Sequence, residues 1–181
     1  MLKTKIAVFV SGGGTNFEAL INAQENGKIP HGEIVLMVSS SKTAYALKRA
    51  ENHGIKSVVC SKKELGSQES FEKEILKNLE ENNIQLIVLA GFMSILSKEF
   101  TKKYENRIIN IHPSLIPSFC GEGFYGLHVH EAALKKGVKV TGATVHIVNE
   151  IPDGGPIIMQ RAVYVEENDT PEILQKRVME Q

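Results

Sequence analysis

The sequence predicts an α/β protein with an open, mostly parallel, twisted sheet, helices on both faces and antiparallel strands near the C-terminus. Short runs rich in Val and Ile alternate with segments whose apolar residues recur every three to four positions, as expected when strands alternate with amphipathic helices. The run at 84–90 is almost continuously apolar, which is typical of a central parallel strand covered on both faces.

The expected elements follow one another with short connections. Expected strands cover 5–10, 34–38, 57–60, 84–90, 107–111, 139–148 and 156–165. Expected helices cover 15–26, 43–53, 71–79, 97–103 and 127–135. The turn at 152–155 joins the last two strands, which we therefore expect to be antiparallel. Thr170 and Pro171 are typical of the N-cap and first position of a final helix, which reaches Gln181 without a stop signal, as in a truncated chain.

Length and composition restrict the classes of function. The 181 residues fit one domain, and 21 Lys plus Arg balance 21 Asp plus Glu, without the basic excess of a nucleic-acid-binding protein. No apolar stretch approaches the roughly 20 residues of a membrane span. Cys60 and Cys120 are too few for a disulfide framework, and no Cys/His spacing indicates zinc. We expect a soluble, cytoplasmic protein without a metal, a nucleic-acid partner or a membrane partner.

Three consecutive glycines, Gly12 to Gly14, lie between the first strand and the first helix. Glycines allow a tight turn that brings N–H groups against a ligand, and a helix N-terminus carries partial positive charge, so this loop predicts an anion site. Thr15 and Asn16 can add side-chain donors; the alternative is an ordinary turn capped by Thr15. A Walker A lysine is missing, and Phe17 stands where a dinucleotide fingerprint has glycine, so a phosphate monoester fits better than ATP or NAD.

Asn110 and His112 lie two residues apart at the end of a predicted strand, so both side chains project from one face of the sheet. Pro113 cannot continue the hydrogen-bond ladder, and open α/β sheets bind ligands where their parallel strands end. An amide donor beside an imidazole suits a reaction in which negative charge develops on a carbonyl oxygen, which predicts a catalytic pair. The alternative is a buried pair satisfied by backbone groups.

Two other segments are candidates for the same site. Asp153 stands in a turn before two glycines, and its carboxylate near His112 would favour the imidazolium and orient the ring. The alternative for Asp153 is plain turn chemistry. The segment 89–96 leaves the central strand through a glycine and stays apolar, so Met93, Ile95 and Leu96 could line a pocket for a flat heterocycle, unless they form a core-packing loop.

Together these segments resemble the glycinamide ribonucleotide formyltransferases, within the folate-dependent formyltransferase superfamily, across essentially the whole chain. The resemblance rests on 11–16, 89–93, 110–115 and 153–156. It implies a Rossmann-like formyltransferase fold in a single domain, 1–181, whose N-terminal half binds a phosphate and whose C-terminal half binds folate and is catalytic. The implied activity is transfer of a formyl group from 10-formyltetrahydrofolate, the co-substrate, to the amine of 5-phosphoribosylglycinamide in de novo purine (IMP) biosynthesis.

The resemblance also implies roles for individual residues, with no metal among them. Catalytic roles fall on Asn110, His112 and Asp153. Phosphate binding falls on Gly14, Thr15 and Asn16, and folate binding on Met93, Ser94, Ile95, Leu96 and Asn110. Ser94 and Gln68 depart from the family, which often has arginine at these positions. The oligomeric state is not indicated.

Three other functions remain open. Formyltetrahydrofolate deformylase usually carries an N-terminal regulatory domain, whereas the first strand here begins at Lys5. Methionyl-tRNA formyltransferase usually carries a C-terminal tRNA-binding domain, for which this chain has neither length nor basic charge. The third alternative is a non-catalytic nucleotide-binding module whose only site is the glycine loop.

Overall fold

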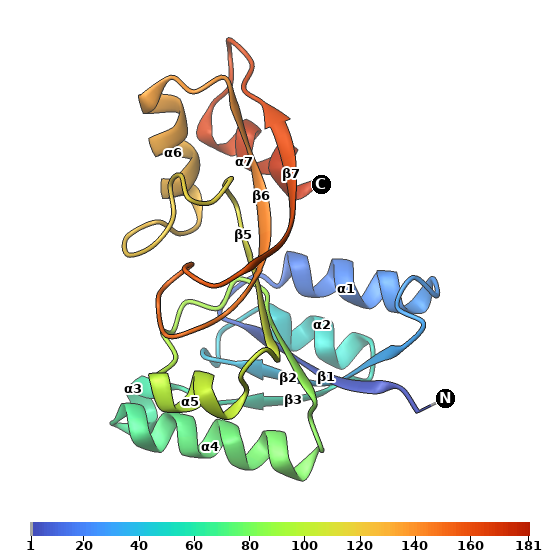
Figure 1. Ribbon diagram of the computed structural model, residues 1–181. Helices are drawn as coiled ribbons and strands as arrows, with labels where there is room; N and C mark the ends of the chain where they lie inside the picture. Colours follow the sequence, from blue (N-terminus) through green and yellow to red (C-terminus); the bar gives the residue numbers. More distant parts are fainter. Residues whose placement is uncertain (1) are drawn as a thin grey trace. The chain divides into compact units, whose positions relative to one another are not determined.

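The structure is a computed structural model that describes residues 2–181 (Figure 1). It divides into two compact units, the first up to Ile108 and the second from Ile109 to Gln181. Each unit contains both β-strands and helices. The expectation of one domain stays a prediction.

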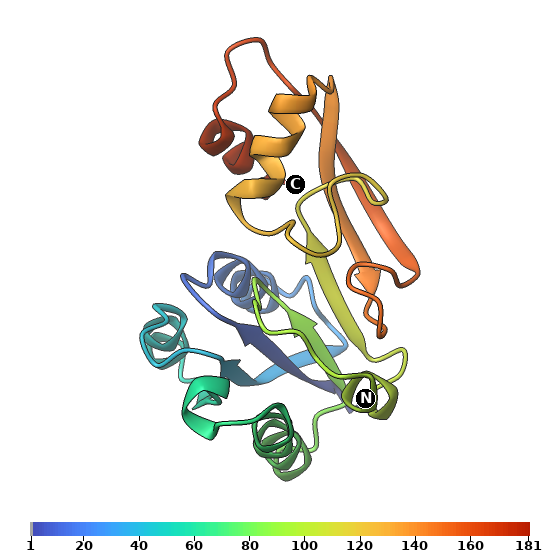
Figure 2. The same ribbon diagram turned by 90° about the vertical axis from the view of Figure 1, so that its left-hand side faces the viewer.

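The first unit contains four parallel strands in the order β3-β2-β1-β4. They are β1 (Thr4–Val10), β2 (Gly32–Ser39), β3 (Lys56–Val59) and β4 (Leu86–Leu89). Its helices are α1 (Thr15–Glu25), α2 (Ala46–Asn52), α3 (Lys62–Leu65), α4 (Gln68–Glu81) and α5 (Lys98–Lys103). Helices α1 and α2 cover one face of these strands, and α4 and α5 cover the other (Figures 1 and 2).

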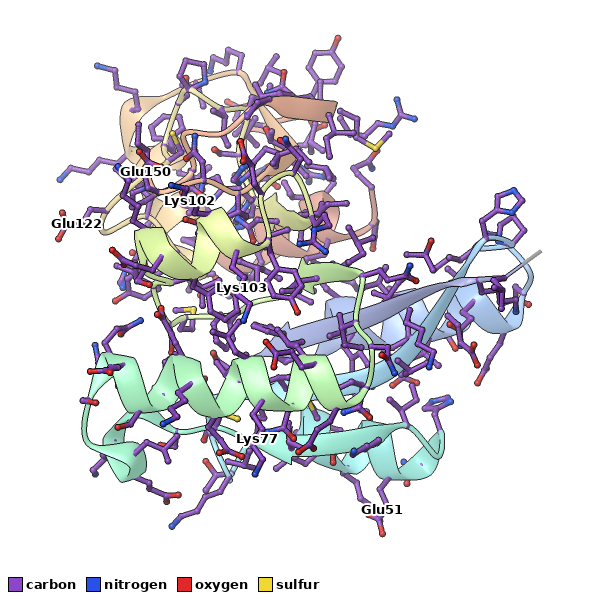
Figure 3. All side chains as sticks on the ribbon, turned by 60° about the horizontal axis from the view of Figure 1, so that its bottom comes forward. Glu51, Lys77, Lys102, Lys103, Glu122 and Glu150 are labelled. Carbon is purple, nitrogen blue, oxygen red and sulfur yellow. The ribbon has the colours of Figure 1, made fainter. Side chains whose placement is uncertain are left out.

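Strand β1 shows why the central strands are apolar along their whole length. Val8 and Val10 belong to the same buried cluster as Phe17 of α1. Phe9 projects to the opposite face, where its ring centroid lies 6.5 Å from that of Phe100 in α5. On that second face α5 is also tied to α4, because Nζ of Lys103, which is labelled in Figure 3, lies 2.6 Å from the Glu80 carboxylate. Burial on both faces removes the alternation of apolar and polar residues.

The second unit contains three antiparallel strands in the order β5-β6-β7. They are β5 (Ile108–His112), β6 (Val140–Ile147) and β7 (Ile157–Tyr164), accompanied by α6 (Leu127–Lys136) and α7 (Pro171–Met179). Ala133 of α6 and Leu174 of α7 share a buried cluster with Val163 of β7. Thr170 caps α7 by accepting a hydrogen bond from the Ile173 N–H at 3.3 Å.

The predicted α/β class is confirmed, with parallel strands first and antiparallel strands last. Helix α3 was not expected, and α2 begins at Ala46 rather than at residue 43. The reason is a local turn in which the Thr43 N–H donates to Ser41 Oγ at 3.2 Å, so the hydroxyl competes with helical hydrogen bonding. Within residues 2–181, no helix combines the length and the apolar character needed to cross a membrane.

Candidate active site

Asp153 is the centre of a polar cluster in the second unit. It lies in the turn after β6 and adopts a positive φ of 54°, and its side chain is only 14 % exposed. Its Oδ2 lies 3.4 Å from His112 Nδ1, and its Oδ1 lies 3.4 Å from His146 Nε2. One carboxylate therefore faces two imidazoles, one from β5 and one from β6.

Asn110 completes the cluster from β5. Its Nδ2 amide donates to Asp153 Oδ1 at 3.3 Å and lies 3.1 Å from His146 Nε2. The antiparallel register places Asn110 opposite His146, and His112 opposite Thr144. The structure thus brings together the three residues that the sequence proposed, Asn110, His112 and Asp153.

Both nitrogens of His112 have acceptors, and the ring is 4 % exposed. Its Nε2 lies 2.8 Å from the Phe119 carbonyl oxygen, which can only accept, so Nε2 carries a hydrogen. Its Nδ1 faces the Asp153 carboxylate. A ring protonated on both nitrogens satisfies both contacts. The arrangement is thus suited to hold an imidazolium against a carboxylate.

The surroundings of Asp153 keep its carboxylate ionised. Burial by itself would raise the pKa of Asp153, because it disfavours the charged form. The contact with His146, the Gly121 N–H that donates to Oδ2 at 2.9 Å, and the charge of His112 oppose burial. Together they outweigh it, and the pKa of Asp153 lies below its ordinary value.

His146 is the member of the cluster that the sequence analysis missed. It is 1 % exposed, and its Nδ1 donates to the Ile147 carbonyl oxygen at 2.9 Å. In the neutral ring, Nε2 accepts from Asn110; in the charged ring, it donates to Asp153. The signal for His146 was its position in a predicted strand, but the sequence did not say which strand it would face.

A second network holds the loop that follows His112. Thr144 Oγ1 donates to the Ser114 carbonyl oxygen at 2.6 Å and accepts from the Ile116 N–H at 3.1 Å. Ser114 Oγ donates to the Ser118 carbonyl oxygen at 2.6 Å. The loop continues to Phe119 and Gly121, which contact His112 and Asp153, so these bonds position both contacts.

The glycine loop lies in the first unit. Gly14 is the N-cap of α1 with φ 72° and supplies no side-chain cap, so the alternative of a Thr15 cap is not what the structure shows. The first-turn N–H groups of α1 have no intrahelical acceptor, as at any helix start, and the N-cap residue offers them no side-chain acceptor. Ser11 links this loop to the next candidate segment: its N–H donates to the Gly91 carbonyl oxygen at 3.0 Å, and its Oγ accepts from the Met93 N–H at 2.8 Å.

The candidate heterocycle segment lines a pocket of about 500 Å³ in the same unit. The residues around it are Lys62, Gln68, Met93, Ser94, Ile95, Leu96 and Ser97. Met93 and Ile95 are 54 % and 70 % exposed, whereas Leu96 is buried. Gln68 holds the segment, since its Nε2 donates to the Ile95 carbonyl oxygen at 3.0 Å. Only part of this segment therefore packs into the core.

The proposed site residues thus fall into two groups. Asn110, His112 and Asp153 lie together in the second unit. The residues proposed for phosphate lie in the first unit, as do those proposed for folate other than Asn110. Among residues 2–181, no three His, Cys, Asp or Glu side chains are grouped as ligands for a metal ion.

Comparison with known proteins gives the family. Residues 4–181 match the family described as formyl transferase. The chain belongs to the formyl transferase family. Two solved structures with similar folds are phosphoribosylglycinamide formyltransferase from Bacillus halodurans and glycinamide ribonucleotide transformylase 1 from Symbiobacterium toebii. They are 41 % and 36 % identical with TM-scores of 0.90 and 0.91; the match covers 98 % of this chain in each case, and 88 % and 81 % of theirs.

Curated relatives of this formyl transferase chain are longer. The trifunctional purine biosynthetic protein adenosine-3 of Gallus gallus is 48 % identical over 98 % of this chain, which spans 17 % of that protein. The chloroplastic phosphoribosylglycinamide formyltransferase of Arabidopsis thaliana is 38 % identical over 98 % of this chain, which spans 61 % of it. The chain therefore spans less than two thirds of these relatives.

Proposed function

We propose that the protein transfers the formyl group of 10-formyltetrahydrofolate to the amine of 5-phosphoribosylglycinamide, a step of de novo purine biosynthesis. The observation that carries this proposal is the Asp153 carboxylate facing His112 and accepting from Asn110, in a chain of the formyl transferase family. The choice of acceptor is supported by the relatives in Arabidopsis thaliana and Bacillus halodurans, both named phosphoribosylglycinamide formyltransferase.

In the proposed reaction, the acceptor amine attacks the formyl carbon and a new C–N bond forms. The formyl oxygen becomes an oxyanion, to which the Asn110 amide and the His112 imidazolium donate hydrogen bonds. The bond between the formyl carbon and N10 of the folate then breaks, and the proton lost by the amine is passed to N10 with the help of Asp153 and His112. Preorganised donors at an oxyanion are each worth roughly 3–4 kcal/mol.

The donors of the cluster are all engaged before substrate arrives. His112 Nε2 donates to Phe119, and the Asn110 amide faces His146 and Asp153. The formyl oxygen therefore has to replace an internal acceptor, and we propose that it replaces the Phe119 carbonyl oxygen. The Asp153 contact on Nδ1 then stays intact and continues to orient the ring.

The substrates bind, in this proposal, through the segments of the first unit. Gly14, Thr15 and Asn16 hold the phosphate, and Met93, Ser94, Ile95 and Leu96 line the pocket for the folate. Asn110 is the one folate residue proposed from the second unit. The hydrogen bond from Met93 N–H to Ser11 Oγ couples the two segments. The cytoplasmic location expected from two cysteines without a disulfide framework stays a prediction.

The test offers 10-formyltetrahydrofolate to the purified protein with each of three acceptors: 5-phosphoribosylglycinamide, methionyl-tRNA and water alone. We expect tetrahydrofolate to form rapidly only with the first, at a one-to-one ratio with formylated acceptor. Equal tetrahydrofolate release without any acceptor would instead identify a deformylase. Formylation of methionyl-tRNA in preference to the ribonucleotide would identify the other alternative.

A further inference from the structure

Arg49 of α2 joins three segments around the glycine loop. Its Nε donates to the Gly13 carbonyl oxygen at 2.9 Å, and its Nη1 donates to Glu18 Oε2 on α1 at 3.0 Å. The Arg49 side chain is 26 % exposed and the Glu18 side chain 27 %. This cation therefore lies beside a candidate anion site, yet it donates to two acceptors of the protein itself.

The positive charge of Arg49 is already balanced by Glu18. The hydrogen bond from Arg49, helped by a contact with His53 and opposed by partial burial, lowers the pKa of Glu18, so this carboxylate is ionised at neutral pH. His53 bridges Glu18 and Glu25 at 3.1 and 2.9 Å, so both carboxylates hold the same ring. The guanidinium also lies 5.2 Å from the Tyr45 ring.

Two carbonyl groups of the glycine loop are tied to α2. The Ala46 N–H donates to the Gly12 carbonyl oxygen at 3.2 Å, and Arg49 holds the Gly13 carbonyl oxygen. In a planar trans peptide, the C=O points opposite to the N–H of the following residue. Holding these two carbonyls toward α2 therefore turns the N–H groups of Gly13 and Gly14 away from it.

The packing of Gly14 against α2 requires the same arrangement. Gly14 has φ +72°, and a Cβ added to it would lie 2.7 Å from the Cβ of Ala46. The loop thus approaches α2 more closely than a side chain at Gly14 allows. A Cβ added to Gly12 or Gly13 would meet no atom within 4 Å, so the loop is open where these two glycines would carry a side chain.

We propose that Arg49 is a positioning residue for phosphate recognition and is not itself a phosphate ligand. By holding the Gly13 carbonyl oxygen, Arg49 keeps the Gly14 N–H directed at the anion. Glu18 holds the guanidinium in place and balances its positive charge. This inference rests on the proposed function of the loop as the phosphate site. It assigns the preference for a phosphorylated acceptor partly to a residue outside the glycine motif.

The experiment compares kcat/KM for 5-phosphoribosylglycinamide with kcat/KM for the same acceptor lacking its phosphate. In Arg49→Lys the charge stays but the Nε donor is lost. We expect the preference for the phosphorylated acceptor to fall about tenfold, the effect of losing one charge-assisted hydrogen bond to the loop. The KM for 10-formyltetrahydrofolate and kcat at saturating acceptor stay within twofold of the wild type.

Lys48→Gln is the matched control. Lys48 is the neighbouring cation on α2 and pairs with Glu51 at 2.8 Å. Both side chains are exposed, and Figure 3 shows Glu51 projecting outward. The Lys48→Gln substitution removes a positive charge one residue before Arg49 on α2, at a side chain that makes no hydrogen bond to the glycine loop. We expect its preference for the phosphorylated acceptor to equal that of the wild type, which would exclude a general charge effect.

Glu18→Gln separates positioning from direct binding. If the Arg49 charge itself bound the phosphate, removing Glu18 would free it and increase the preference, which would overturn the inference. Positioning predicts a preference that falls two- to threefold, because the glutamine oxygen can still accept from Arg49 but no longer holds the guanidinium through a charge. If the Tm of Arg49→Lys shows that this variant does not fold, Glu18→Gln still distinguishes positioning from direct phosphate binding.

The two levels of the proposal fail differently. A wild-type protein that uses both acceptors equally well would show that the loop is not a phosphate site, and the proposed function would fail with the inference. A wild-type preference that survives unchanged in Arg49→Lys would overturn the inference alone. Stabilisation by inorganic phosphate, read as the rise in Tm, should follow the same order: wild type equal to Lys48→Gln, and both above Arg49→Lys.

Discussion

The two candidate sites of this protein are built from different materials. The cluster around Asp153 consists of side chains, of which His112 is 4 % and His146 1 % exposed. The glycine loop consists of backbone groups, and both Gly12 and Gly13 are exposed. Moving a proton requires titratable groups with a suitable pKa. Burial allows the neighbouring groups to set that pKa. Holding an anion requires only N–H groups with a fixed direction, which a fold can supply by tying the carbonyls behind them.

Asp153→Asn tests whether charge is essential in the buried cluster and should have the largest effect. The amide keeps the shape of the side chain but cannot hold an imidazolium or take part in proton transfer. We expect kcat to fall at least about a hundredfold, within the range found for general acid–base groups. Steady-state formyl transfer at saturating concentrations of both substrates measures it.

The matched control for Asp153→Asn is Asp169→Asn. Asp169 is also an ion-paired aspartate of the second unit, but its partner is Arg177 of α7, at 2.6 Å. It should keep the kcat of the wild type within twofold. A kcat of Asp153→Asn within about threefold of wild type, in a protein with native circular dichroism, would remove Asp153 from the reaction.

Gly14→Ala tests whether the exposed loop depends on backbone geometry. The new Cβ would force Ala46 away and strain a residue held at φ +72°. We expect the KM for the phosphorylated acceptor to rise at least about tenfold and stability to fall by about 1–3 kcal/mol, as for other strained left-handed positions. The KM for 10-formyltetrahydrofolate should change much less.

Gly27→Ala is the control for the backbone strain alone. Gly27 follows α1 with φ +70°, and a Cβ there would meet no atom within 4 Å. It should lower stability like Gly14→Ala but leave the KM for the phosphorylated acceptor unchanged. If both variants raised this KM equally, strain in α1 rather than the packing of the loop against α2 would explain the effect.

His146→Gln tests how the pKa of Asp153 is set. Contact with His146 lowers the pKa of Asp153, so its loss raises that pKa. The acid limb of the rate–pH profile, where Asp153 becomes protonated, should therefore move to higher pH. We expect kcat at neutral pH to fall about two- to tenfold, the effect of one hydrogen bond in the cluster. His128→Gln, which alters an exposed histidine paired with Glu131 at 2.9 Å, should change neither quantity; an unmoved acid limb in His146→Gln would contradict this account.

The sequence could predict Asn110 and His112 because both lie on one strand, where a spacing of two residues fixes a common face. It could also suggest Asp153, but only as a turn residue with a second possible role. His146 escaped because its role depends on the register of β6 against β5, which places it opposite Asn110. Register is a contact between segments 36 residues apart, and no local pattern encodes it.

The same limit applies to the first unit. Local patterns predicted its parallel strands and the glycine loop, since apolar periodicity and glycine runs are properties of neighbouring residues. Arg49 attracted no attention in the sequence, because its acceptors, Gly13 and Glu18, lie 36 and 31 residues away. The start of α2 was also misplaced, because the hydroxyl of Ser41 holds a turn that apolar periodicity does not detect.

Asp169 is the aspartate of the second unit that lies outside the cluster. We expect Asp169→Asn to have the smallest effect on activity but a clear effect on stability. Arg177 holds both carboxylate oxygens of Asp169, at 2.6 and 2.7 Å, and this lowers the pKa of Asp169 below its ordinary value of 3.8. A carboxyl whose pKa is lower in the folded state stabilises the fold fully above the pKa of the unfolded state. That contribution is lost as pH falls from about 3.8 through the folded pKa.

We therefore expect the Tm of Asp169→Asn to lie a few degrees below that of the wild type at pH 7, with the gap closing below about pH 4. Thermal unfolding followed by circular dichroism across this pH range measures it, with Glu167→Gln, an exposed carboxylate of the same loop, as the control that leaves Tm unchanged. A gap that persisted below the folded pKa would show that Asp169 acts through its neutral hydrogen bonds, such as the one it accepts from the Glu166 N–H at 2.8 Å. A closing gap would mean that Asp169 stabilises the fold through the charge that it places against Arg177.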